Sequence, residues 1–600
     1  MTKRQTLSHL LVAMCIGLPL QWSVEAAPAS TGGGYYERVK LKAGESKASY
    51  LLDIASQNDE TLHSFLVSNK KNDRFLTRGD PAAVRALKKV QSFYGSCVNE
   101  RRLTHAGPEP LQAELAKLTK MLLPPAGLSQ HTNDTKKVAL SKLLGYNMRH
   151  GLENPFNFEM WDNPNIPGYR ILALQQNGKG LKEDEYYNAD ELMRMYTRVI
   201  GRMLYMIEGG DKKKGGSKRR PTGSIPDRFM QLASDVAYFE QILAGAEVTK
   251  APQNEKAPAR SSLHNKAAQA RDRQQRHRHL ARRQDEEVVE ELPDDHIEWD
   301  TIDDLNEAMP ALDWNLIFKT AFPADVPIPT ELNMLWSFYL KRLNRAFTES
   351  SMETIRNYFA WTMIRTLGTE LAEPYRRPLI ALENFMPGGD KKLQKRQETR
   401  SLACVDLVNG YIGQLAGHFF VKSIFPEPAQ DNFQDMVTSI RWTFEKALWE
   451  YDWLDNETRE NAIRKLKAIV SKLGFSHEHP NVGSSHAIDQ WYQDLTLHKN
   501  DHFGNIMRSR QWRAEQFLRE LPRPVNRLST SSIPQIANGF FNPTGNAIEI
   551  LAGILREPFF HPDAPEYLNF AGIGTVAAHE IGHGFDNNGR VYDENGLMRD

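Results

Sequence analysis

Residues 574–586 read GTVAAHEIGHGFD and place two histidines and a glutamate in a short apolar setting. His579 and His583 are four positions apart, so a helix would carry both imidazoles on one face, about one turn apart. Two neutral imidazoles held in this way suit Zn²⁺, which favours nitrogen ligands in a tetrahedral site. Glu580 follows the first histidine and is well placed to take a proton from a metal-bound water. The stretch therefore predicts a helix that binds zinc.

The spacing is the H-E-x-x-H pattern of zinc peptidases. The alternative is a chance match on a solvated helix. The residues before His579 are small and apolar, as expected for a helix packed in a core, where buried histidines and a carboxylate need polar partners. This setting favours the metal site over the chance match.

The flanking sequence is long enough to compare with a known family. Residues 538–560 read NGFFNPTGNAIEILAGILREPFF, and residues 568–598 read LNFAGIGTVAAHEIGHGFDNNGRVYDENGLM. Together they resemble the neprilysin and endothelin-converting-enzyme family of zinc metallopeptidases. The resemblance implies a mainly α, two-lobed metallopeptidase fold with a smaller α+β catalytic lobe. Two departures are visible, since Gly539 stands where the family has Ala and Leu551 where it has Pro, and neither touches a metal ligand.

The resemblance also implies roles for individual residues. His579 and His583 would bind Zn²⁺, Glu580 would be the general base, and Asn538 and Gly539 would hold a short peptide substrate. The residue pattern itself predicts two strands, 533–541 and 547–551, joined by the turn Asn542-Pro543-Thr544-Gly545. An edge strand beside the zinc helix can hold an extended peptide by main-chain hydrogen bonds. The alternative for Asn538 is a polar residue that ends a strand.

A catalytic zinc site needs three protein ligands and a water. The family takes its third ligand from a Glu in an E-x-x-x-D motif on a later helix, which we expect beyond Asp600, so the catalytic lobe is expected to be incomplete. Asp586 either orients an imidazole or caps the helix, and His477 and His479 are expected in a loop. Two hypotheses follow: a secreted zinc endopeptidase that hydrolyses short peptides, or a catalytically inactive relative that binds peptides or a partner protein.

Composition gives no argument for a nucleic-acid partner or an anionic membrane surface. Lys and Arg number 75, and so do Asp and Glu, so the formal net charge is zero. The length is compatible with several domains or with one large bilobal enzyme. The oligomeric state is not predicted by any of these features.

Residues 1–26 have the three parts of a cleavable signal peptide. Lys3 and Arg4 are basic, residues 10–20 are apolar, and residues 24–26 offer small side chains for cleavage. The apolar run is shorter than a membrane span needs. We therefore expect a secreted, extracellular protein without stable membrane insertion; the alternative is an uncleaved signal anchor that tethers it to a membrane.

The remaining chain is expected to form three parts. Residues 27–89 read as a lead-in followed by a helical segment, residues 90–475 as a large helical lobe, and residues 476–600 as a partial catalytic lobe. Within the helical lobe, the tracts near 210–221 and 248–295 lack apolar periodicity and are predicted to be mobile inserts. Polyanion binding or cleavage at paired arginines are the functional alternatives for these inserts.

Three cysteines are present, and Cys15 lies in the leader. In an exported protein the remaining pair, Cys97 and Cys404, suggests a disulfide, with two unpaired buried thiols as the alternative. These cysteines stand where the family has a bridge. Asn133 and Asn456 begin N-x-[ST] sequons and are predicted glycosylation sites, although Asn456 or Asp455 is also a candidate helix N-cap.

Overall fold

The computed structural model describes residues 50–599 except 68, 164–165, 167, 211–224, 247–298, 335–336, 387–398, 426 and 531. The predicted signal peptide, the lead-in before residue 50 and the predicted insert 248–295 lie outside the described residues, as does the insert near 210–221 apart from Gly210.

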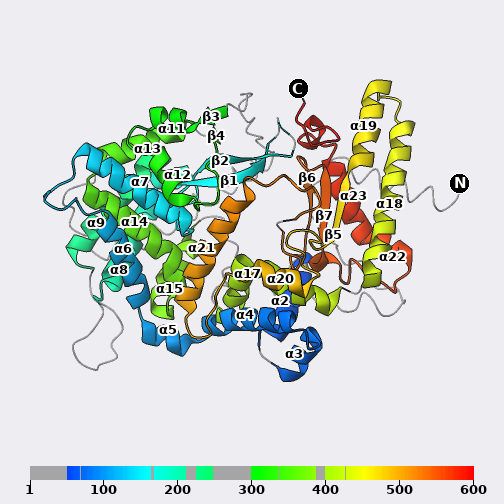
Figure 1. Cartoon of the computed structure of the whole chain (residues 1–600), viewed down its shortest axis with the longest axis horizontal. Coiled ribbons are helices and arrows are strands. Elements are labelled where there is room, and N and C mark those ends of the chain that lie inside the picture. The colour runs from blue at the N-terminus through cyan, green and yellow to red at the C-terminus, as the bar shows by residue number, and fades with distance from the viewer. Residues whose placement is uncertain are drawn as a thin grey trace, which may run out of the picture.

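Most of the described chain is helical. The larger part of the molecule, on the left and along the bottom of Figure 1, is built from α2 (Tyr50–Leu66), α3 (Lys70–Thr77), α4 (Pro81–Cys97), α5 (Glu100–Ala106), α6 (Glu109–Met121), α7 (Asn133–Arg149), α8 (Asp190–Ile207), α9 (Asp227–Ala244), α11 (Ile302–Ala308), α12 (Trp314–Ala321), α13 (Ser337–Glu349), α14 (Met352–Leu367), α15 (Glu373–Phe385), α17 (Arg400–Ile424), α20 (Ser485–Trp491) and α21 (His502–Glu520). The smaller part contains α18 (Glu427–Glu450), α19 (Asn456–Ala468), α22 (Glu566–Ala571) and α23 (Ile573–His583).

Several helices begin where the sequence supplies a side-chain cap. Asp80 precedes Pro81 at the start of α4 and accepts a hydrogen bond from the Ala82 amide at 2.9 Å. Asp455 starts α19 by accepting from the Thr458 amide at 2.8 Å. The N-cap of α19 is therefore Asp455, which leaves Asn456 exposed in the first turn.

Two small sheets interrupt the helices. The first has the order β1-β2-β4-β3 and consists of β1 (Phe156–Asp162), β2 (Arg170–Gln176), β3 (Trp299–Thr301) and β4 (Glu331–Met334). The second has the order β5-β7-β6 and consists of β5 (Val470–Gly474), β6 (Gly539–Asn542) and β7 (Ala547–Leu551). Residues 90–475, expected to form a large helical lobe, thus also contain the strands β1 to β5, because these segments pair with distant partners that local periodicity does not reveal.

Buried apolar side chains form two cores. The larger core takes side chains from α2 through α17 and again from α20 and α21. The smaller core is formed by α18, α19, β5, β7 and α23. The expected boundary at residue 475/476 does not separate them: residues 433–473 pack in the smaller core, whereas residues 482–521 return to the larger one.

The large lobe is also held by a disulfide between Cys97 at the end of α4 and Cys404 in α17, both fully buried. This is the pair that the resemblance implied. The Arg400 Nε donates to the Cys97 carbonyl at 2.9 Å, so the two helix ends are joined by a polar contact as well.

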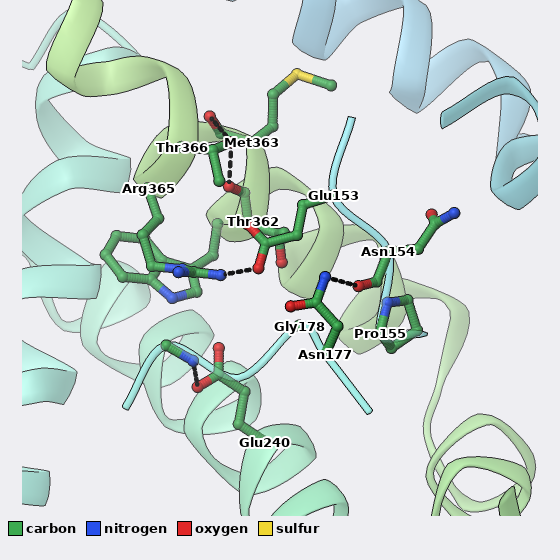
Figure 2. A network of polar contacts seen from close by, with 12 residues as sticks. Glu153, Asn154, Pro155, Asn177, Gly178, Glu240, Thr362, Met363, Arg365 and Thr366 are labelled. Atoms are coloured by element: carbon green, nitrogen blue, oxygen red, sulfur yellow. Dashed lines mark hydrogen bonds and ion pairs between the residues drawn. The ribbon is translucent and has the colours of Figure 1, made fainter. Parts of the chain in front are cut away.

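Figure 2 shows a buried polar network where α9 and α14 meet the loops that flank β1 and β2. Arg365 of α14 pairs with Glu153, and Asn177 donates to the Asn154 carbonyl at 3.1 Å. Glu240 of α9 is fully buried, and one carboxylate oxygen accepts three hydrogen bonds. Buried charges are tolerated when they are paired and hydrogen-bonded; here Glu240 has three donors, and the Arg365–Glu153 pair is only partly buried.

No helix among the described residues is both long and apolar enough to cross a bilayer.

Candidate active site

Helix α23 lies between the three-stranded sheet and α18 (Figure 1). Ile573, Ala577 and Ile581 are fully buried on one face, and Ala578 is nearly so. Gly574 approaches the Met436 sulfur of α18 closely, since a Cβ there would lie 3.4 Å from it. Small side chains on the first two turns thus let α23 pack tightly, as the sequence predicted, and present its last turn beside β6.

His579 and His583 lie together on this last turn. Their Nε2 atoms are 3.0 Å apart, and their ring centroids are separated by 4.4 Å. Two nitrogens that each lie about 2.0–2.1 Å from one tetrahedral Zn²⁺ are about 3.3 Å apart, so the pair fits two positions of such a site. Burial lowers the pKa of His579, and the neighbouring His583 lowers it further, which favours the neutral form that binds a metal.

Asp586 holds His583 in this orientation. Its Oδ2 lies 2.8 Å from the His583 Nδ1, and its Oδ1 accepts hydrogen bonds from the amides of Asn588 and Gly589 at 2.9 and 2.7 Å. A carboxylate on Nδ1 keeps the proton there and leaves Nε2 free for a metal. Of the two roles left open by the sequence, the structure supports the one in which Asp586 orients an imidazole.

The Glu580 side chain lies against the three-stranded sheet. It is 6% exposed and packs against Gly539, the first residue of β6. Burial raises the pKa of Glu580 to about 7, and the nearby His583 opposes this rise. The acid is therefore held in a partly desolvated position between α23 and the edge strand.

The edge strand is shorter than predicted. β6 begins at Gly539 rather than at residue 533, because residues 533–536 form a turn in which the Ile536 amide donates to the Ile533 carbonyl at 3.3 Å. The second strand, β7, has the predicted bounds. In the sheet order β6 pairs with β7 alone, so among the described residues no second strand lies along its other edge.

Asn538 is exposed and precedes this strand. Its side-chain oxygen accepts from the Gly539 amide at 3.0 Å, and its carbonyl accepts from the Leu551 amide at 3.2 Å. The structure thus brings Gly539 next to Glu580, and Asn538 immediately precedes Gly539 on the edge strand.

A cavity of about 2890 Å³ lies between the large lobe and the sheet. Its walls include Glu153, Arg510, Lys472, Asn542, Thr544 and Tyr592. His579, Glu580 and His583 do not line it. The cavity therefore reaches the end of β6 and the segment after α23 but does not include the histidine pair.

The side chains at this site match part of a zinc site. The two imidazoles match zinc in atom type and separation, as described above. Across the described part of residues 50–599, no group of three or more His, Cys, Asp or Glu side chains is placed to hold a metal ion. The described residues therefore bring together two imidazoles whose separation suits zinc and one carboxylate that orients one of them.

A helix that carries His-Glu-x-x-His beside the edge strand of a sheet is typical of zinc-dependent peptidases. The chain belongs to peptidase family M13: the N-terminal profile of this family matches residues 30–476, and its peptidase profile matches residues 538–600.

Among curated relatives, endothelin-converting enzyme 1 of Rattus norvegicus is 26% identical over 533 residues, which are 87% of this chain and 61% of that protein. Neprilysin-1 of Caenorhabditis elegans is 31% identical over 303 residues, which are 50% of this chain and 39% of that protein. The chain spans about three fifths of the length of endothelin-converting enzyme 1.

Solved structures show the same fold. The zinc metalloprotease Zmp1 of Mycobacterium tuberculosis, in complex with an inhibitor, superposes with a TM-score of 0.69 at 21% identity, covering 94% of this chain and 73% of that chain. PepO of Lactobacillus rhamnosis gives a TM-score of 0.66 at 18% identity, covering 94% and 76%. The expected mainly helical metallopeptidase fold is thereby confirmed.

Sequence reasoning missed two residues that support this site. Asn58 of α2 and Lys465 of α19 are buried and bind main-chain atoms around the hairpin and after α23. Neither carries a local signal, because a single Asn or Lys in an amphipathic helix is ordinary on a solvated face. Asn133 and Asn456 are both exposed at helix starts, so their glycosylation stays a prediction.

Proposed function

We propose that this protein is a secreted zinc endopeptidase that cleaves short peptides. The observation that carries the proposal is the convergence of the His579 and His583 Nε2 atoms, 3.0 Å apart, beside the buried Glu580 and a free strand edge. Membership in the peptidase family supports a peptide substrate.

In this proposal the free edge of β6 pairs with an extended peptide through main-chain hydrogen bonds. Asn538 can donate to and accept from one peptide unit, because its side chain has both an amide N–H and a carbonyl. Gly539 leaves the space in which the Glu580 carboxylate meets the peptide. These contacts would place the scissile bond next to the last turn of α23.

His579 and His583 would hold Zn²⁺, which when bound polarises a carbonyl and lowers the pKa of a coordinated water. Glu580 would accept a proton from the coordinated water and later pass it to the nitrogen of the leaving amine. Asp586 keeps the Nδ1 proton of His583 in place, so that the Nε2 lone pair faces the metal position.

A second candidate is a catalytically inactive relative that binds peptides or a partner protein. It is favoured by the finding that the described residues bring only two metal ligands together. Such a protein would keep the edge strand and the large lobe as binding surfaces while it held zinc weakly.

We propose export on the basis of residues 1–26, whose basic, apolar and small-residue parts match a cleavable signal. The Cys97–Cys404 disulfide supports a location in an oxidising compartment, where such bonds form and persist. N-terminal sequencing of protein from the culture medium should give a start near Ala27. Retention of Met1 in a membrane fraction would instead support the signal anchor.

The deciding experiment combines three measurements on the natural protein: intact mass, zinc content, and cleavage of a fluorogenic peptide with and without a chelator. The endopeptidase proposal expects chelator-sensitive cleavage that Glu580→Gln abolishes while zinc stays bound, and that His583→Ala abolishes together with zinc. Peptide binding without turnover in protein that contains zinc would establish the second candidate. A recombinant chain of residues 27–600 should bind zinc weakly and cleave poorly, since two ligands fix neither the metal nor its water.

A further inference from the structure

Lys465 is a buried lysine that lies beyond the residues assigned to the site. It is 5% exposed, and its Nζ donates to the carbonyls of Gly589 and Tyr592 at 2.5 and 2.6 Å. A lysine is almost never fully buried unless it is paired, and here its partners are main-chain oxygens. The ammonium group also lies 5.8 Å from the centre of the Phe585 ring.

The two carbonyls belong to the segment that follows α23. This segment turns back through the short 3₁₀ helix Gly589–Val591, and a Cβ on Gly589 would lie only 1.9 Å from the His583 carbonyl oxygen. Within this turn the Gly589 carbonyl accepts from the Tyr592 amide at 3.1 Å, and the ammonium group from α19 adds a second donor to that carbonyl and one to the Tyr592 carbonyl. Lys465 thus fixes the point at which the chain leaves the histidine helix.

The same segment carries Asp586, and the two contacts are linked through one residue. Gly589 accepts from Lys465 with its carbonyl and donates with its amide to the Asp586 Oδ1 at 2.7 Å. The other oxygen of Asp586 lies on the Nδ1 of His583. A continuous path of hydrogen bonds therefore runs from Lys465 through Gly589 and Asp586 to His583.

The position of Lys465 is itself fixed. Asn546, which is fully buried in the turn between β6 and β7, donates to the carbonyls of Lys465 and Glu594, both at 3.1 Å. The side chain and the carbonyl of Lys465 thus join α19, the hairpin turn and the segment after α23. Truncating the side chain would remove the Lys465 donor from both carbonyls, and the segment would lose its tie to α19.

We propose that Lys465 is a positioning residue of the metal site: it holds residues 586–592 in the conformation in which Asp586 fixes the orientation and tautomer of His583. This inference rests on the proposed function for the presence of zinc. It adds a residue of α19, more than a hundred positions before the motif, to the machinery that sets metal affinity. Mutating a group that orients a metal ligand typically lowers metal affinity by about 10–100-fold. Lys465 acts on the ligand His583 only through Asp586, so we expect its mutation to lower zinc affinity by about tenfold.

The test compares four forms of the mature natural protein: the unchanged protein, Lys465→Met, Asp586→Asn and the double variant. Methionine keeps the length and apolar stem of lysine and removes the donors. Lys467→Met is the matched control, because Lys467 is on the same helix, is 61% exposed and pairs with Glu445. Zinc affinity is measured by competition with a chromophoric chelator, and circular dichroism establishes that each variant is folded.

We expect Lys465→Met to lower zinc affinity about tenfold and Lys467→Met to leave it unchanged. Because Lys465 acts through Asp586, the double variant should bind zinc no more weakly than Asp586→Asn alone. Unchanged affinity in Lys465→Met would overturn the proposal, and so would a double variant whose loss is the product of the two single losses.

A second readout needs no metal and separates this proposal from the proposed function. In zinc-free protein, ¹⁵N chemical shifts of His583 should show a proton on Nδ1 in the unchanged chain and a mixture of tautomers in Lys465→Met. If the unchanged protein binds no zinc, the proposed function fails, and the tautomer measurement still decides the role of Lys465. A single Nδ1–H tautomer in both proteins would overturn that role. If Lys465→Met does not fold, Lys465→Arg is used, which keeps the donors but changes their reach and should give a smaller loss of zinc affinity.

Discussion

A methyl group on Gly539 would lie 3.1 Å from both Cγ and Oε1 of Glu580 and 2.9 Å from Cδ1 of Ile550. The first residue of the edge strand and the proposed general base therefore share one small space. The size of the residue at position 539 sets how close the carboxylate can come to the strand, and hence to a peptide bound along it.

We expect Gly539→Val to reduce peptide cleavage by about 100-fold or more while zinc affinity stays within about twofold. The branched side chain must displace Glu580, and a shift of about 1 Å at a reacting group can cost about that factor. Gly95→Ala is the control, because a Cβ at Gly95 meets nothing within 4 Å. Steady-state kinetics and zinc titration measure the two effects; an active Gly539→Val enzyme would show that Glu580 does not act from this position.

Asn58 of α2 joins the two segments that flank the β6–β7 hairpin. Its Nδ2 donates to the carbonyls of Gln535 and Gly553 at 3.0 and 2.9 Å, and its Oδ1 accepts from Arg556 at 2.9 Å. We expect Asn58→Ala to cost about 2–3 kcal/mol of unfolding free energy, because buried carbonyls lose their donors. Amides of β6 and β7 should exchange faster with deuterium, whereas Asn72→Ala, which removes a half-buried asparagine bonded to the Ser64 carbonyl, should leave them unchanged.

Replacing Cys97 and Cys404 together by serine should lower the free energy of unfolding by about 2–5 kcal/mol. The disulfide closes a separation of 307 residues, and a crosslink over a long loop restricts the unfolded chain most. Denaturant unfolding with and without a reductant measures the effect. Alkylation of both thiols in the native, unreduced protein would contradict the crosslink itself.

Glu240 accepts from the Tyr187 and Tyr196 hydroxyls at 2.7 and 2.8 Å and from the Gly180 amide at 3.1 Å (Figure 2 shows the amide contact). Glu240→Leu should destabilise the protein by more than about 3 kcal/mol, because three buried donors lose their acceptor. Glu240→Gln should cost less, since an amide oxygen still accepts. Thermal unfolding measures both, and Glu191→Leu at an exposed position of α8 is the control.

His418 gives the stability a defined dependence on pH. It is fully buried, its Nδ1 lies 2.6 Å from the Val482 carbonyl, and burial lowers its pKa to about 4, an effect that Lys422 strengthens and Asp80 opposes. Because the folded protein keeps this imidazole neutral, the unfolded chain binds the extra proton first as the pH falls below about 6.5. The free energy of unfolding should therefore drop by about 3 kcal/mol between about pH 6.5 and pH 4.

His418→Gln should remove this part of the pH dependence, whereas His486→Gln, at an exposed position of α20, should retain it. Urea unfolding at a series of pH values measures the slope. An unchanged slope in His418→Gln would assign the acid sensitivity to other groups.

The sequence by itself determined the parts that depend on residues close together in the chain. The four-residue spacing of His579 and His583 and the small residues before them specify a helix with both imidazoles on one face, and the structure has this helix over Ile573–His583. The bounds of β7 and the cap at Asp455 likewise follow from local chemistry. The family resemblance added the fold and the pairing of Cys97 with Cys404.

Only the tertiary structure decided how distant segments meet. The strand predicted from residue 533 begins at Gly539, because the turn before it is held by Asn58 and by α17 rather than by a strand partner. Lys465 and the Asp586 segment meet across more than a hundred residues, and α18 and α19 leave the large lobe to pack with α23. Local periodicity specifies which face of an element is apolar, but the partner of that face depends on the packing of the whole chain, and so does the burial of single polar side chains such as Asn58 and Lys465.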